Sequence, residues 1–282
     1  MEILQISLAS VQRELEISLQ HTIDVVKFGL TAAEEATEKE LAYPDLTIGY
    51  STAANAILTF PEVKHRFHLR TLTNGMRDAV EIVGAFLETA RSACAATMLV
   101  AKTQASSMTE LSTLDWNSQV QSDARKFHKL GLPDKIEHFG SKYSELLIPE
   151  ATAEIKSINQ GRNCLVHRLG VVTDIDLNTR DGLLIQWNKL QLVAEGSWGR
   201  CNIGKDGKVV DIYGVPQLAD QVMMRIDKKE KLFSKGDAIM FDAEEFSDIY
   251  FTCVLFGNQL ISKISDYAIS QGLPLNSPIT LA

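Results

Sequence analysis

Apolar residues recur at steps of three and four over most of the first 170 residues, and this spacing constrains the fold more than any other feature. One such stretch covers residues 8–40, and the longest covers residues 70–102. An α-helix has about 3.6 residues per turn, so this spacing gathers the apolar side chains on one face. Helices of this kind bury their apolar faces against one another. We therefore expect a helical bundle.

Proline and glycine mark where the remaining helices should begin and end. These helices are expected over residues 48–60, 117–130, 133–147 and 150–169. Pro61 should end the first of them, because proline disfavours helix in the residue before it. Pro149 is suited to the first turn of the last helix, and Gly170 is suited to the position just after its end.

After Gly170 the helical spacing gives way to short apolar runs that are typical of strands. Strands are expected over residues 183–192, 200–203, 209–213, 221–226 and 238–241. Asp206-Gly207 predicts a hairpin turn, because these residues tolerate positive φ. Asp242 and Glu245 then form the pattern of a capping box, which predicts a last helix that ends near residue 270.

The sequence thus predicts a mainly α protein in which a small antiparallel β insert precedes the last helix. Residues 1–68 are assigned to an N-terminal helical extension. Residues 69–172 and 242–272 are assigned to the helical bundle, and residues 173–241 to the β-rich insert.

A formal net charge of −8 and a pI near 5.3 argue against a general nucleic-acid binder. If an RNA or DNA backbone is a partner, a local basic patch must hold it against the overall field. The densest basic run is 64–70, Lys-His-Arg-Phe-His-Leu-Arg, and a second, mixed with acids, spans 225–235. The simpler interpretation of either run is a solvated face.

Four cysteines are scattered without metal-ligand or disulfide spacing, and we interpret them as reduced, mostly buried thiols. No apolar run approaches the length that spans a bilayer, so no membrane is expected as a partner. The first residues show neither a basic region nor a cleavable apolar segment. These features together predict a cytoplasmic protein.

Several common chemistries lack their motifs in this sequence. There is no Walker-type phosphate loop, no G-x-G-x-x-G after a strand, no G-x-S-x-G elbow and no H-E-x-x-H. His65 and His68 are three apart, but no third metal ligand lies near them in the sequence. We expect neither a metal nor another cofactor.

The strongest candidate for chemistry is the end of the helix over 150–169, where Arg162, Asn163, His167 and Arg168 lie within seven residues. Asn163 and His167 are four apart and share a helix face. Arg162 is about 140° away from His167 on an ideal helix. Its long side chain can swing toward that face, so the three polar groups can converge on one anion.

The segment Arg162-Asn163-x-x-x-His167 resembles the R-x(4–6)-H signature of the HEPN superfamily, whose members are α-helical bundles. The preceding residues 127–136 and the last helix also fit the general layout of such domains. The resemblance covers residues 70–170 and 242–270. It does not account for the first helix or for the β insert.

Many HEPN proteins are metal-independent endoribonucleases that act as dimers, with two motifs facing each other. The resemblance implies that His167 is the acid/base group, that Arg162 binds the scissile phosphate, and that Asn163 orients His167 or donates a hydrogen bond. The attacking group would be the 2′-hydroxyl of the RNA, so DNA should resist cleavage. Arg168 is either a further phosphate contact or a solvent-facing cation that favours the helix C-terminus.

The resemblance leaves alternatives open. HEPN toxins that a partner nucleotidyltransferase controls usually carry a Tyr two residues after the His, where this chain has Leu169. A ribonuclease in a stress, toxin or phage-defence context would have RNA, a second copy and a neutralising or regulatory protein as partners. The alternatives are a catalytically inactive HEPN-like interaction or scaffold module, and an unrelated helical protein whose Arg162 and His167 pair with carboxylates.

Overall fold

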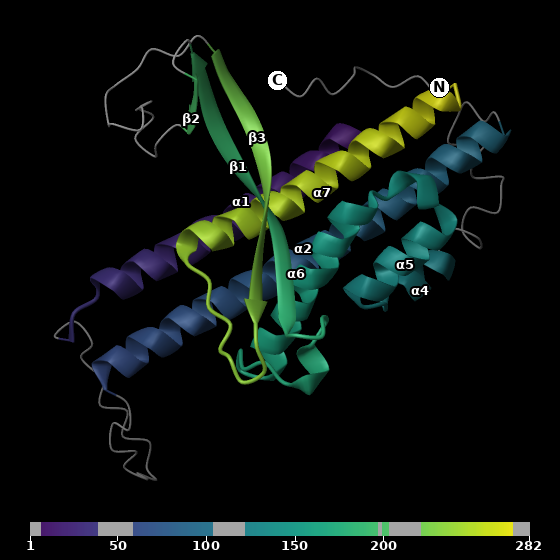
Figure 1. Cartoon of the computed structure of the whole chain (residues 1–282). Helices are drawn as coiled ribbons and strands as arrows, with labels where there is room; N and C mark the ends of the chain where they lie inside the picture. Colours follow the sequence, from purple (N-terminus) through teal and green to yellow (C-terminus); the bar gives the residue numbers. More distant parts are fainter. Residues whose placement is uncertain (1–6, 39–58, 104–121, 197–198, 203–220, 273–282) are drawn as a thin grey trace.

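The chain folds into a bundle of long helices with a small antiparallel sheet before the last helix (Figure 1). The computed structural model describes residues 7–38, 59–103, 122–196, 199–202 and 221–272. Its α-helices are α1 (Leu8–Glu35), α2 (Phe60–Thr103), α4 (Ser122–His128), α5 (Leu132–Lys142), α6 (Pro149–His167) and α7 (Ala243–Ser270). Its strands are β1 (Leu183–Gly196), β2 (Gly199–Asn202) and β3 (Gln221–Phe233). Two 3₁₀ turns complete it, η3 (Ser144–Leu146) and η4 (Asp174–Asp176).

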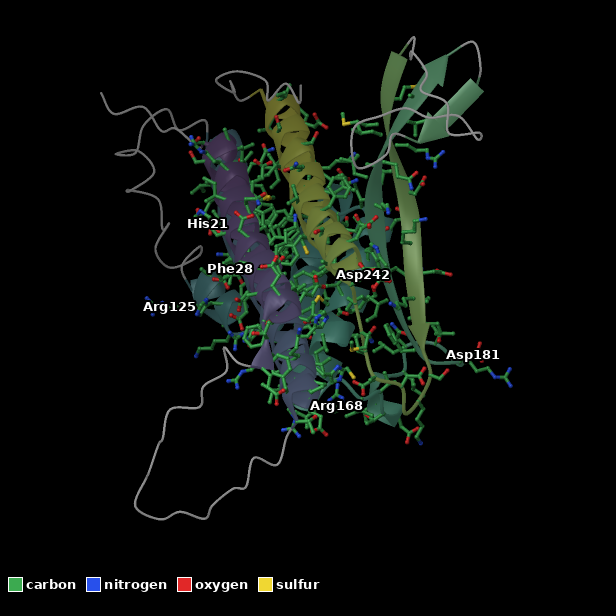
Figure 2. All side chains as sticks on the ribbon, turned by 90° about the vertical axis from the view of Figure 1, so that its left-hand side faces the viewer. His21, Phe28, Arg125, Arg168, Asp181 and Asp242 are labelled. Atoms are coloured by element: carbon green, nitrogen blue, oxygen red, sulfur yellow. The ribbon has the colours of Figure 1, made fainter. Side chains whose placement is uncertain are left out.

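The last helix begins and ends where the sequence predicts. The Asp242 side chain accepts hydrogen bonds from the backbone N–H groups of Glu244 and Glu245, and the Glu245 side chain accepts from the Asp242 N–H. This reciprocal pair satisfies N–H groups that a helix start otherwise leaves without partners. Figure 2 marks Asp242 where α7 begins. The predicted capping box is therefore confirmed.

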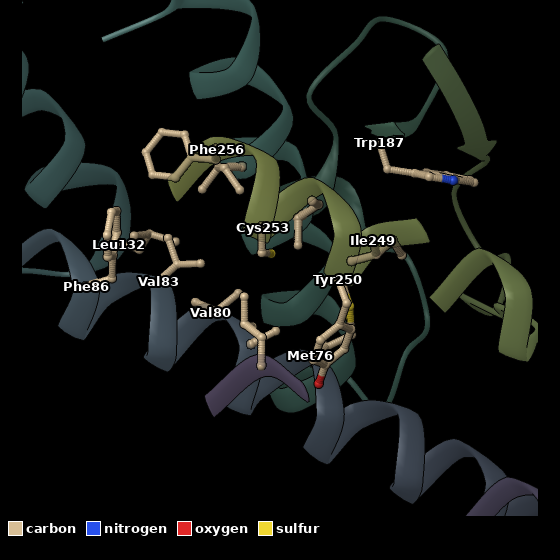
Figure 3. Packing of buried hydrophobic residues seen from close by; sticks show 14 of the residues in the cluster. Met76, Val80, Val83, Phe86, Leu132, Trp187, Ile249, Tyr250, Cys253 and Phe256 are labelled. Atoms are coloured by element: carbon tan, nitrogen blue, oxygen red, sulfur yellow. The ribbon is translucent and has the colours of Figure 1, made fainter. Parts of the chain in front are cut away.

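The centre of the bundle is an apolar core to which α1, α2, α6 and α7 contribute. Figure 3 shows side chains of α2, among them Met76 and Val80, packed against Ile249, Tyr250 and Cys253 of α7. The buried Tyr250 hydroxyl donates to the Gly75 carbonyl at 2.8 Å, so its polar atom is satisfied inside the core. The predicted helical spacing thus marks the faces that become buried.

The predicted boundary at residue 68 is wrong, because it falls inside the continuous helix α2. Pro61, which was expected to end a helix, lies in the first turn of α2. The Thr59 N–H and hydroxyl both donate to the Glu62 carboxylate, which caps that start. Helix α1 also packs on α2 and α7, so it belongs to the bundle and is not an extension. The expected helix over 48–58 lies outside the described residues.

By length and composition, α2 over Phe60–Leu99 passes the test for a helix that can cross a membrane. The apolar stretch that passes is 56% buried inside the bundle. A core helix meets the same criterion, so this stretch is explained by the packing just described.

The cysteines within the described residues are buried thiols. Cys94, Cys164 and Cys253 are free, and burial raises the pKa of the Cys253 thiol to about 12.

The three strands form an antiparallel sheet in the order β2-β1-β3. β1 pairs along its whole length with β3, with Leu183 opposite Phe233 and Glu195 opposite Gln221. β2 pairs only with the far end of β1, over Val193–Gly196. The near half of β1 therefore has one edge without a neighbouring strand. Figure 1 shows this near half against α6 and α7 and the far end extending beyond the bundle.

Three side chains from outside the sheet satisfy the open edge of β1. Each of them accepts a hydrogen bond from the N–H of one strand residue: Asn178 from Leu184, Ser157 from Gln186, and Thr252 from Asn188. The Asn178 amide also donates to the Leu184 carbonyl oxygen at 2.8 Å. The N–H bonds are 2.7, 3.0 and 2.8 Å long. An unpaired strand edge is otherwise open to water or to another chain. Here α6, α7 and the segment between α6 and β1 close the edge.

The near half of the β insert is consequently part of the bundle core. Leu183, Ile185 and Trp187 alternate along β1, and all three are buried in the same cluster as the helices. The predicted insert over 173–241 is thus antiparallel, as expected, but it is not a separate unit. Residues 238–241 form a single bridge, Val171 to Ala238, instead of a strand. The predicted hairpin turn and the strand over 209–213 lie outside the described residues.

The closed edge of β1 predicts that two threonine-to-valine substitutions differ in their effect on stability. Thr252→Val keeps the shape of a buried side chain but leaves the Asn188 N–H without its partner, so we expect it to lower the free energy of unfolding by about 1–3 kcal/mol. Thr152 on α6 is the control, because its buried hydroxyl has no partner among the described residues. Thr152→Val should be neutral or stabilising. Urea unfolding of both variants measures the difference, and equal losses would contradict it.

Candidate functional site

The candidate site lies on the last two turns of α6, on the side of the helix opposite its buried residues Cys164 and Leu165. Gly161 faces β1 so closely that an added Cβ would lie 2.5 Å from Cδ1 of Ile185. Any larger residue would displace the Ile185 methyl, so α6 packs closely on the β1 side chains at the residue before Arg162. After His167 the helix ends at Leu169 and Gly170, which adopt φ values of +54° and +76°. The predicted end of the helix is confirmed within two residues.

The Arg162 guanidinium is partly buried between α6 and α2. Its Nη1 donates to Oδ1 of Asn163 at 2.9 Å, and its Nη2 lies 3.8 Å from Oε1 of Glu81 on α2. Its Nε is buried and has no hydrogen-bond partner among the described residues. The Arg162 side chain is 21% exposed and the Glu81 side chain 61% exposed. Solvent screens this pair, so its contribution to stability is small.

Asn163 connects the arginine to the histidine face of α6. Its amide oxygen accepts from Arg162, so its NH₂ group is the end of the amide that is left to donate. His167 lies one turn later on the same face and is exposed. No hydrogen bond joins His167 to Arg162 or Asn163 within the described part of the chain. The structure therefore brings Arg162 and Asn163 together and leaves the His167 imidazole open to solvent.

Arg168, the fourth predicted residue, turns away from this group toward the loop after α6. Its Nε donates to Oδ2 of Asp176 at 2.8 Å, and its Nη2 pairs with Oδ1 of the same carboxylate. The Asp176 side chain is completely buried, and the N–H and hydroxyl of Thr173 donate to it as well. A phosphate would have to break this ion pair to use Arg168. The structure favours Arg168 as the residue that fixes the end of α6.

Burial alone would raise the pKa of the Asp176 carboxyl, but the hydrogen bonds from Arg168 and Thr173 outweigh it and hold the pKa below its usual value. The charged form is therefore stabilised in the folded protein. The Arg168–Asp176 pair thus holds η4 against the end of α6.

Sequence reasoning missed two acidic residues that shape the site. Glu81 lies more than 80 residues before Arg162, and no local pattern links the two. Asp176 did carry a signal, because Thr173-x-x-Asp176 has the spacing of a capping box. That spacing predicts a local turn but does not reveal that Arg168 is its partner.

Within the described ranges, no group of three or more His, Cys, Asp or Glu side chains is close enough to hold a metal ion. His65 and His68 line a shallow groove with Lys64, whose Nζ donates to the carbonyl oxygens of Glu34 and Ala36. Lys64 is thus used to close the end of α1.

Comparison of the chain with protein-family models, with curated proteins and with solved structures found no match in any of the three. The function must therefore be argued from the residues and from their geometry.

The buried ion pair predicts a pH-dependent loss of stability in Asp176→Asn. The depressed pKa means that the carboxylate stabilises the fold above its unfolded pKa of about 4, and that this contribution is lost as the pH falls through the lower folded value. We expect the variant to lose about 2 kcal/mol at pH 7 and the difference from wild type to shrink below about pH 4.

The control for this prediction is Asp174→Asn, two residues away. Asp174 forms an exposed pair with Lys235 and should contribute less than about 0.5 kcal/mol. Denaturant unfolding at pH 7 and pH 3 measures both variants. Equal effects of the two substitutions, or a loss in Asp176→Asn that does not depend on pH, would contradict the assignment.

Proposed function

We propose that this chain is a metal-independent endoribonuclease of the HEPN type that acts as a homodimer. The observation that carries the proposal is the arrangement at the end of α6. A partly buried arginine touches an asparagine whose free NH₂ end shares a helix face with an exposed histidine. Together they can supply a proton-transfer group, a cation for the phosphate and a hydrogen-bond donor without a metal.

Each side chain has a role that follows from its chemistry. The Arg162 guanidinium forks onto phosphate oxygens and stays charged throughout the reaction. The His167 imidazole exchanges a proton near neutral pH. Asn163 can donate its NH₂ group to the histidine ring or to the phosphate.

The reaction itself argues for two copies. The 2′-oxygen attacks phosphorus and loses its proton, while the bond from phosphorus to the 5′-oxygen breaks and that oxygen gains a proton. The products are a 2′,3′-cyclic phosphate and a 5′-hydroxyl. One imidazole cannot remove one proton and supply the other at the same moment. Two motifs that face each other supply two imidazoles, one as base and one as acid.

Arg162 is lightly restrained in the free subunit, and this suits a phosphate ligand. Its contact to Glu81 is long and the Glu81 carboxylate is exposed, so a phosphate can replace that carboxylate at low cost. The same contact supports a second candidate function, an inactive interaction module of the HEPN type. In that case Glu81 and Asn163 are the permanent partners of Arg162, and the motif fixes one end of the bundle.

Cleavage of single-stranded RNA in EDTA tests the proposal. We expect 2′,3′-cyclic phosphate ends, no cleavage of DNA, and a loss of at least about 100-fold in rate for Arg162→Ala and for His167→Ala. Lys156→Ala is the matched control, because it removes an exposed cation from the same helix. It should leave the rate unchanged.

Two results would decide against the nuclease. If RNA stays intact while the protein forms a stable dimer, the interaction module is favoured. If the protein is monomeric and Arg162→Ala lowers only its stability, the motif has a structural role.

A further inference from the structure

The solvent face of α2 carries a stripe of polar and basic residues. Arg66, Arg70, Asn74 and Arg77 are all exposed, and they lie four, four and three residues apart. This spacing places them on one face of the helix. With a rise of about 1.5 Å per residue, Arg70 lies about 6 Å beyond Arg66, and Arg77 about 10 Å beyond Arg70. The stripe includes the end of the basic run that the sequence shows over 64–70.

The charges on this stripe are available to an anion. No carboxylate lies within 4 Å of Arg66 or Arg70 among the residues that the structure describes. Arg77 pairs with Asp78 at 3.2 Å and with Glu81 at 3.8 Å, and the three side chains are 41–61% exposed. Exposed pairs of this kind are weak and easily replaced. On a chain of net charge −8, such a stripe is a local attraction for a polyanion.

Two exposed aromatic rings stand beside the arginines. Phe28 on α1 is 77% exposed and Phe67 on α2 is 48% exposed. Both line a groove of about 530 Å³ between α1 and α2, and Arg70 and Asn74 line it as well. Figure 2 labels Phe28 on α1, about two helical turns from His21, which borders the same groove. Exposed aromatic rings interleaved with arginines suit stacked bases with a phosphate backbone beside them.

The stripe leads to the motif. Glu81 lies 3.8 Å from Nε of Arg77 and 3.8 Å from Nη2 of Arg162. One exposed carboxylate thus stands between the last arginine of the stripe and the arginine of the candidate site. An anionic chain that displaces Glu81 can contact both guanidinium groups in turn.

We propose that the α2 face, with Arg66, Phe67, Arg70 and Arg77, is a track that binds one strand of RNA and leads it to Arg162. This inference rests on the proposed function for what happens at the end of the track. Binding along the track does not depend on cleavage. The backbone contacts and the stacking also do not need the 2′-hydroxyl, so single-stranded DNA of the same sequence should bind as a ligand that cannot be cut.

Fluorescence anisotropy with a labelled single-stranded DNA of about 12 nucleotides tests the track. Binding should weaken with salt, with a slope of about −0.7 in log K against log salt for each phosphate that is neutralised. The variant Arg66→Ala/Arg70→Ala/Arg77→Ala should bind at least tenfold more weakly and should lose about 2 from that slope. Circular dichroism should show an unchanged fold, since all three residues are exposed.

The matched control is Arg13→Ala/Arg125→Ala/Lys263→Ala. These three residues are also exposed, lie on α1, α4 and α7, and remove the same three positive charges. If both triple variants lose affinity equally, or if neither does, the track is overturned. Such a result leaves the nuclease proposal standing when the RNA is still cut.

Two single changes test the track in opposite directions. Phe67→Leu keeps an apolar side chain but removes a stacking ring, and it should weaken binding about fivefold. Glu81→Gln removes the competing carboxylate and should tighten binding by a factor of about 2 to 5. Unchanged affinity in both would overturn the proposal. The proposal would also be overturned if the protein formed a dimer that Phe28→Asp dissociates and that single-stranded DNA does not. The groove would then be the contact surface for a second copy of the chain.

Discussion

The structure depends on the way in which the near half of β1 is closed. This strand has β3 on one side and no strand on the other, and three side chains satisfy the polar groups of its open edge. Ser157 comes from α6, Thr252 from α7, and Asn178 from the segment between α6 and β1. Because Ser157 and Thr252 each accept from one strand N–H, and those N–H groups are two residues apart, they hold α6 and α7 in register with the strand.

The contact between α6 and the edge of β1 fixes the position of the candidate site. On α6, Ser157 binds the strand edge, Gly161 allows the close approach to Ile185, and Arg162 is the next residue. Beyond it, the Arg168–Asp176 pair fixes the end of the helix. Arg168 and Arg162 therefore differ in how firmly their partners hold them. Arg168 is committed to a buried carboxylate, whereas Arg162 keeps a weak and exposed partner that a ligand can replace.

The sequence predicted the elements that local rules govern. The end of α6 and the capping box of α7 were placed correctly, because proline, glycine and the Asp242–Glu245 pair act on neighbouring residues. The sequence-based prediction was wrong where packing against another helix or strand determines the structure. Pro61 was interpreted as an end although it lies at a start, and the β insert was separated from a core into which Ile185 and Trp187 are buried.

The same distinction holds for the site. The grouping of Arg162, Asn163 and His167 on the end of one helix follows from spacing alone. The partners Glu81 and Asp176 could not be assigned, because a contact between distant segments leaves no local pattern in a single sequence. Whether two motifs meet across a dimer is likewise a property of surfaces and remains part of our proposal.

The central claim is that the end of α6 is a phosphate-binding surface on which Arg162 and His167 act together. The most direct measurement is two-dimensional NMR of the histidine ring and backbone amide signals during titration with uridine 3′-monophosphate. We predict that the His167 ring signals and the amides of residues 162–167 shift together, and that Arg162→Ala abolishes the shifts. Unchanged His167 signals at millimolar nucleotide, or shifts that persist in Arg162→Ala, would contradict the account.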